Sequence, residues 1–116
     1  MPYQESRAVR ADRKTLEMAY AIPDVKPVKE LFAVLADETR LRILYILTDG
    51  ETCVCDITRA LGCTISNTSH HLRVLREARL ISSRRKGKHI LYKLDDKHVL
   101  GLIREGFQHA AHTSRE

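Results

Sequence analysis

Apolar residues recur every three or four positions over most of the chain, a spacing that predicts a series of amphipathic helices. The first predicted helix follows Asp12, which can cap it, and stops before Pro23. The second begins after Pro27 and breaks just before Asp37, which can cap a third helix that ends at Gly50. The first half of the chain is therefore predicted to hold three helices.

Two short helical patterns follow, with one glycine between them. The first, CVCDITRAL, places Ile57 and Leu61 four residues apart and stops at Gly62. The second, TISNTSHHLRVLREARL, starts from the capping residue Thr64. Its predicted inward stripe consists of Ile65, Thr68, Leu72 and Leu75. Two short helices joined by a glycine-containing turn are typical of a helix-turn-helix unit.

After residue 80 the apolar period changes to alternation, which predicts a β-hairpin. Its turn lies at Lys86-Gly87, and Ile90, Tyr92 and Leu94 alternate on one face. A last helix starts near Asp95 or Asp96 and carries an apolar stripe expected to form a dimer contact: Val99, Leu102, Ile103 and Phe107.

This order of elements predicts a mainly α fold with a small β-hairpin, a winged helix-turn-helix whose terminal helices form a dimer interface. We expect residues 1–12 to be a flexible N-terminal segment and residues 113–116 to be a flexible tail. Residues 13–112 then form one winged helix domain for DNA binding and dimerisation.

Composition narrows the functional class. Among 116 residues, 20 Lys and Arg exceed 15 Asp and Glu, and the resulting charge of +5 favours a polyanionic partner such as nucleic acid. Neither a membrane-spanning apolar run nor a secretory signal is present, so we expect a cytoplasmic protein. The three cysteines do not predict a disulfide framework. With no nucleophile constellation or phosphate loop, an enzyme is not expected.

Two groups of polar residues are candidates for DNA binding. The solvent face of the second short helix offers hydrogen-bonding groups and a cation that suit base edges and phosphates: Ser66, Asn67, Ser69, His70 and Arg73. A solvated helix face would have a similar composition. The hairpin tip gathers four cations, Arg84, Arg85, Lys86 and Lys88. An edge hairpin protected by charge is the alternative, but mutually repelling cations fit an anionic partner better.

The C-terminal helix carries four residues of metal-ligand type, in the pattern Asp96-x-His98 and His109-x-x-His112. His98 and His109 lie three turns apart on one face, which separates them by about 16 Å along the axis. A zinc ion needs its ligands within about 2.2 Å, so one straight helix cannot close this site. Two antiparallel copies can, with one Asp and three His suited to zinc or cobalt. Solvated histidines are the alternative.

Cys53-x-Cys55 is a second candidate metal site, since a pair of thiolates suits a soft ion such as cadmium, lead or arsenite. Two ligands are too few, and residues 1–52 contain neither Cys nor His. Cys63 is expected in the turn beyond the short helix. Small half-buried residues at a helix entry explain the pair equally well.

Taken together, ADETRLRIL, ETCVCDI, TISNTSHHLRVL, RRKGKHILYKL and the Asp96-x-His98 to His109-x-x-His112 pattern resemble the ArsR/SmtB family of metal-sensing repressors. The resemblance covers about residues 28–112. It implies a homodimer that binds a palindromic operator and releases it when zinc binds the C-terminal helices, with cobalt, nickel or cadmium as other candidate ions.

The resemblance also implies a cadmium/lead or arsenite sensor as an alternative, because Cys53 and Cys55 match the cysteine pair of those branches. The chain departs from both patterns, since it lacks N-terminal ligands and has Thr58 where arsenite sensors carry a third cysteine. Further alternatives are a constitutive DNA-binding protein with a structural metal, a zinc hydrolase and a metallochaperone.

Overall fold

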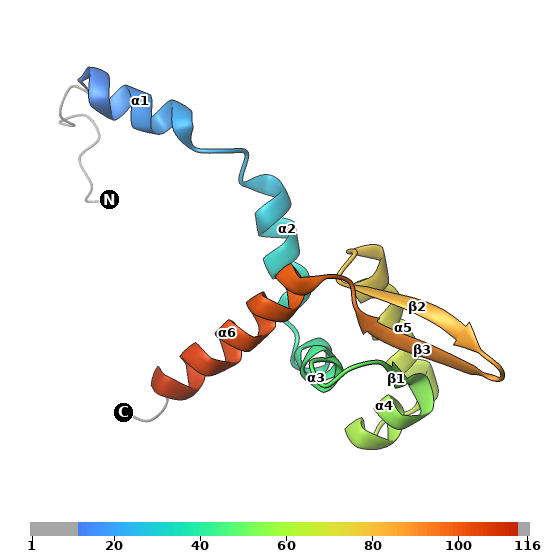
Figure 1. Ribbon diagram of the computed structural model, residues 1–116. Helices are drawn as coiled ribbons and strands as arrows, with labels where there is room; N and C mark the ends of the chain where they lie inside the picture. Colours follow the sequence, from blue (N-terminus) through green and yellow to red (C-terminus); the bar gives the residue numbers. More distant parts are fainter. Residues whose placement is uncertain (1–11, 114–116) are drawn as a thin grey trace.

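The computed structural model describes residues 12–113 of the chain. The elements follow in the order α1 (Arg13–Ala21), α2 (Lys26–Leu35), α3 (Glu38–Leu47), β1 (Thr52–Cys53), α4 (Val54–Leu61), α5 (Ile65–Glu77), β2 (Ile81–Lys86), β3 (His89–Leu94) and α6 (Lys97–Thr113). Figure 1 shows α3, α4, α5 and the sheet gathered into one body, from which α6 and the α1–α2 arm extend. This is the predicted winged helix-turn-helix with a helix added at each end.

The N-terminal helix α1 stands away from the rest of the molecule. Asp12 caps it by accepting a hydrogen bond from the Thr15 N–H at 2.8 Å, as the sequence predicts. None of its residues is buried, and Tyr20 is 86% exposed. A helix that leaves its apolar side chains in water offers them as a surface for contact with another molecule.

The helix-turn-helix consists of α4 and α5. Gly62 ends α4 in the left-handed conformation, at φ 66°, which a glycine adopts without strain. Thr64 caps α5 by accepting from the Asn67 N–H at 3.0 Å. Thr68, Leu72 and Leu75 of α5 are buried, but Ile65 is 53% exposed. The prediction for Ile65 is wrong, because the first turn of α5 extends past the core.

The wing is a three-stranded sheet with the order β1-β3-β2. The hairpin of β2 and β3 was predicted, although its two-residue turn is Gly87–Lys88, one residue later than expected. Gly87 has φ 63°, which suits the glycine-first turns that join antiparallel strands. The strand β1 was not predicted, because two residues are too few to show alternation.

The core lies where α3, α5 and α6 meet the sheet, around Ile43, Leu44 and Leu75. Val99 and Ile103 of α6 are 8% and 3% exposed and belong to this core. The prediction that these two residues form a dimer contact is therefore wrong, because their side chains are already covered within the chain.

The predicted flexible ends lie outside the described residues, apart from Asp12, which caps α1, and Thr113, the last residue of α6. Among residues 12–113, no helix is long and apolar enough to cross a membrane.

Candidate nucleic-acid interface and metal site

The predicted reading face of α5 is fully available to a partner. Ser66, Asn67, Ser69, His70 and Arg73 are all exposed. The opposite face of the helix is anchored to the core through Thr68, whose hydroxyl is 3.0 Å from the Cys63 Sγ and donates to the Thr64 carbonyl at 3.1 Å. Because buried contacts fix the helix in rotation, the exposed residues keep one orientation toward a partner.

A half-buried polar cluster ties α5 to the start of α3. The His71 Nδ1 lies 3.4 Å from the Arg40 Nη1 and 3.8 Å from the Asp37 Oδ2. Arg40 also donates through Nε to the Val34 carbonyl at 2.7 Å. Burial lowers the pKa of His71, and the N–H of Arg40 lowers the pKa of Asp37. Sequence reasoning missed this cluster because its members lie 31 or more residues from His71.

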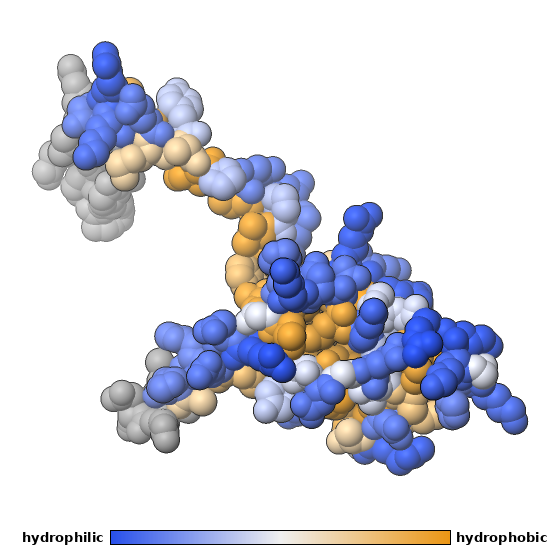
Figure 2. All heavy atoms as spheres, in the orientation of Figure 1, coloured by the Kyte–Doolittle hydropathy of each residue, from blue (hydrophilic) through white to orange (hydrophobic). Residues whose placement is uncertain are grey.

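The cations of the wing do not all face the same side. Side chains alternate along a strand, so Arg85 shares the face of Ser83 while Arg84 and Lys86 point to the other face. Figure 2 shows the outer wing mainly as hydrophilic surface. The cations of the wing therefore face both sides of the sheet.

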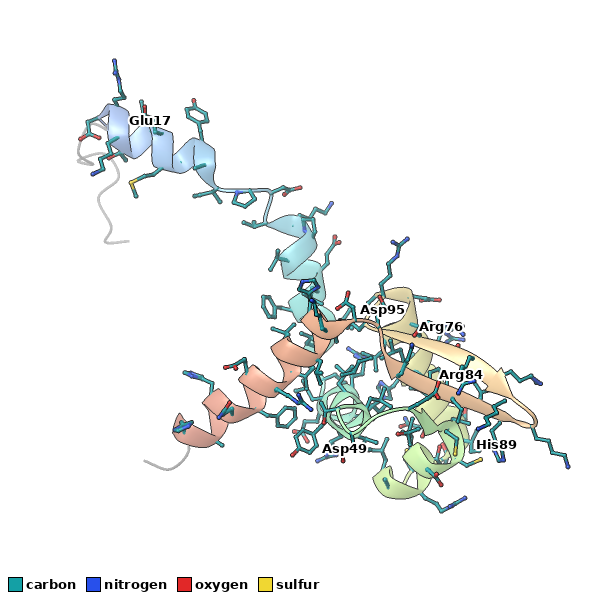
Figure 3. The ribbon with its side chains drawn as sticks, viewed as in Figure 1. Glu17, Asp49, Arg76, Arg84, His89 and Asp95 are labelled. Atoms are coloured by element: carbon teal, nitrogen blue, oxygen red, sulfur yellow. The ribbon has the colours of Figure 1, made fainter. Side chains whose placement is uncertain are left out.

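One of these cations already has an acidic partner. Arg84 donates through Nε and Nη2 to the two carboxylate oxygens of Glu51, at 2.7 and 2.8 Å. The hydrogen bond from Arg84 lowers the pKa of Glu51, and Glu51 raises that of Arg84. Arg84, labelled in Figure 3, thus ties the wing to the segment before β1. Glu51 was not recognised from the sequence, because only the sheet register brings it to Arg84.

At the start of α6 the predicted ligands Asp96 and His98 lie together. The Asp96 Oδ1 accepts hydrogen bonds from the backbone N–H groups of His98 at 2.9 Å and Val99 at 3.0 Å, so it caps the helix. The His98 Nδ1 is 3.7 Å from the same oxygen, and both side chains are exposed. One carboxylate and one imidazole are thus held side by side, with donor types that fit zinc.

The other two predicted ligands lie near the far end of the same unbroken helix. His109 and His112 are exposed and one turn apart on α6. Within residues 12–113, no three His, Cys, Asp or Glu side chains gather closely enough to hold one ion. The structure therefore places the four residues in two separate pairs at the two ends of α6.

The cysteine pair lies where β1 passes into α4. Cys53 is the N-cap of α4 and makes no side-chain capping bond, and Cys55 lies in the first turn. Both thiols are half-buried and not in a disulfide. Thr58, one turn further on, has a buried hydroxyl with no hydrogen-bond partner among the described residues. These positions supply two thiols on one chain and no third.

The comparisons with known proteins agree with this architecture. Residues 37–83 match the family described as bacterial regulatory protein, arsR family. The cadmium resistance transcriptional regulatory protein CadC homolog of Staphylococcus aureus is 40% identical over 71% of this chain and 69% of its own length. The transcriptional repressor SmtB homolog of Synechocystis sp. is 38% identical over 91% and 76%.

Among solved structures, a similar one is the homodimeric winged helix-turn-helix DNA-binding domain from Mycobacterium bovis, a possible ArsR-family transcriptional regulator. It has a TM-score of 0.69 at 28% identity and covers 90% of each chain. The relatives are transcriptional regulators and not enzymes, which confirms the expectation that this chain is not an enzyme. The chain therefore belongs to the ArsR/SmtB family of metal-responsive transcriptional repressors.

Proposed function

We propose that the protein is a homodimeric repressor that leaves its operator when zinc binds between the two α6 helices. The observation that carries this proposal is the pairing of Asp96 with His98 at one end of α6 and of His109 with His112 at the other. Each pair is half of a four-ligand site. An antiparallel partner would complete both halves, giving two sites related by symmetry.

A second copy of the chain also fits the apolar surface. A groove of about 280 Å³ between α2, α3 and α6 is lined by Phe32, Leu35, Leu41, Leu102, Ile103, Gly106, Phe107 and Ala110. Phe32 and Phe107 are 52% and 39% exposed, and Figure 2 shows hydrophobic surface along α2. A surface of this kind is typical of a subunit interface. The proposed dimer contact thus keeps Leu102 and Phe107 of the predicted stripe and adds Phe32 and Leu41, while Ile103 lies buried beneath the groove.

In the proposed complex, α5 lies in a major groove and the wing follows the neighbouring backbone. Asp96 and His98 of one subunit, with His109 and His112 of the other, would hold the zinc ion. Bound zinc supplies a fixed cross-link between the two α6 helices and takes no part in covalent chemistry. A dimer fixed in a spacing that fits the two half-sites less well loses DNA affinity by linkage.

The test is a DNA-release titration. A labelled duplex selected by the protein from random sequences is followed by fluorescence anisotropy as zinc is added. We expect zinc to release the wild-type protein from the duplex. His98→Ala should bind the same duplex and stay bound as zinc is added. Release of His98→Ala by zinc would show that another site senses the metal.

A second candidate is a soft-metal sensor that uses the unpaired thiols Cys53 and Cys55 at the entry to α4. The same titration with cadmium and arsenite, on wild type and on a Cys53→Ser/Cys55→Ser variant, separates the two. If the double variant keeps its zinc response and loses a cadmium response, both sites act.

A further inference from the structure

A polar cleft of about 440 Å³ separates the recognition helix α5 from the wing. It is lined by Ser66, Ser69, His70, Arg73, Arg76 and Tyr92. Four of these residues belong to the predicted reading face. Arg76 and Tyr92 were not predicted to contact DNA, and the cleft places them beside that face. No acidic residue is among the six, so the cleft presents two guanidinium groups and three hydroxyls without a neutralising carboxylate.

Arg76 bridges from α5 to the sheet. Its Nη1 donates to the Ser83 Oγ of β2 at 3.5 Å. Ser83 is directly opposite Tyr92 in the β2–β3 ladder, so these two side chains lie on the same face of the sheet. Arg76, Ser83 and Tyr92 therefore form one row from α5 across both strands. Arg76 is labelled between α5 and the wing in Figure 3.

Tyr92 is held rigidly within this row. It lies on the central strand β3, between Thr52 of β1 and Ser83 of β2. Its half-buried ring packs against the hydrophobic core. Among residues 12–113, its hydroxyl makes no hydrogen bond, and it is not a buried unsatisfied group. A tyrosine in this setting presents a polar tip at the edge of an apolar body.

Folding stability does not explain the charges of the cleft. Arg73 and Arg76 are exposed and three residues apart on α5, where like charges repel. A guanidinium carries five N–H donors, and the long contact with Ser83 uses one of them. Guanidinium and hydroxyl donors converging on one cavity match the oxygens of a phosphate.

We propose that this cleft seats one backbone phosphate of the duplex and that Arg76 and Tyr92 contact it. The inference rests on the proposed function, because it requires that α5 and the wing bind the same duplex. Neighbouring major and minor grooves are separated by a phosphodiester backbone. A protein that places a helix in one groove and a wing at the next must therefore pass that backbone through the cleft between them.

The test compares metal-free Arg76→Ala and Tyr92→Phe with wild type on the selected duplex and on a random duplex, over a range of salt concentrations. We expect Arg76→Ala to weaken binding about tenfold and to reduce the slope of log affinity against log salt by about 0.9. Tyr92→Phe should weaken binding about threefold without lowering the melting temperature. Both effects should be equal on the two duplexes, since a phosphate contact carries no sequence information.

Arg42→Ala is the matched control, because Arg42 pairs with Glu38 at 3.3 Å and does not line the cleft. Its slope should equal that of wild type. If both cleft variants bind DNA with the affinity and the salt slope of the wild type, the phosphate seat is overturned. The proposed function is unaffected by that result. A loss confined to the selected duplex would also overturn it, because it would indicate base contacts. If the wild type binds neither duplex, the proposed function fails as well.

Discussion

Arg84 in the middle of the wing forms a two-pronged ion pair with Glu51, a residue 33 positions earlier in the chain. The pair links β2 to the segment before β1, and so connects the two outer strands of the sheet across the central strand β3. A cation in such a pair has its charge neutralised before DNA arrives. Arg84 and Arg85, which are neighbours in sequence, are thus expected to behave differently toward DNA.

We expect Arg85→Ala to lower the salt slope of DNA binding by about 0.9, as the loss of a phosphate contact does. Arg84→Ala should lower it by less, because Glu51 already balances its charge. Anisotropy titrations at several salt concentrations measure both slopes. Equal losses in the two variants would indicate that Arg84 leaves Glu51 when DNA binds.

Asp96 has two roles that substitutions can separate. Asp96→Asn keeps a capping side chain for the His98 and Val99 N–H groups, so the melting temperature should stay near that of wild type while zinc release of DNA is lost. Asp96→Ala removes the cap too and should cost about 1 kcal/mol of unfolding free energy. Zinc release that persists in Asp96→Asn would exclude the carboxylate as a ligand.

Phe32 tests the proposed subunit interface. It is 52% exposed and lines the groove beside α6, so Phe32→Glu should fold. Its dimer should dissociate at a much higher protein concentration than the wild-type dimer, because the new charge would be buried in the interface. Sedimentation velocity over a concentration series measures this. Lys29→Glu, on the same helix but outside the groove, makes the control, and an unchanged dimer in Phe32→Glu would contradict the assignment.

His71 should make stability depend on pH near neutrality. Burial lowers its pKa below the ordinary 6.5, although Asp37 opposes the shift and Arg40 and His70 add to it. The unfolded chain then binds more protons, so stability is full above 6.5 and falls as the pH drops through the lowered folded pKa. Asp37 adds a separate loss of unfolding free energy at lower pH, because its own pKa is also lowered.

Urea unfolding between about pH 5 and about pH 8 checks this, with His71→Gln as the comparison. The variant should lose the pH dependence of its stability within this window. When the titration is extended below pH 3.8, it should keep the loss of stability that protonation of Asp37 causes. A wild type whose unfolding free energy stays constant as the pH falls through this window would contradict the argument.

The order of elements was predictable because it rests on local signals. Asp12, Asp37 and Thr64 accept the capping hydrogen bonds that the sequence predicts, and Gly62 adopts the left-handed conformation expected at a helix end. Ile65 was mispredicted because helical periodicity does not show where the core stops. The pair of cysteines at a helix entry was also visible from sequence.

The sequence by itself determined the helix-turn-helix, the cationic hairpin and the spacing of Asp96, His98, His109 and His112, because these features depend on residues close together along the chain. Only the tertiary structure decided that Arg84 pairs with Glu51, that Arg76 and Tyr92 share a cleft, and that Val99 and Ile103 belong to the core. These relationships join elements that are distant in sequence. The physical reason is that strand register and helix packing, which set such contacts, are fixed by the whole fold at once.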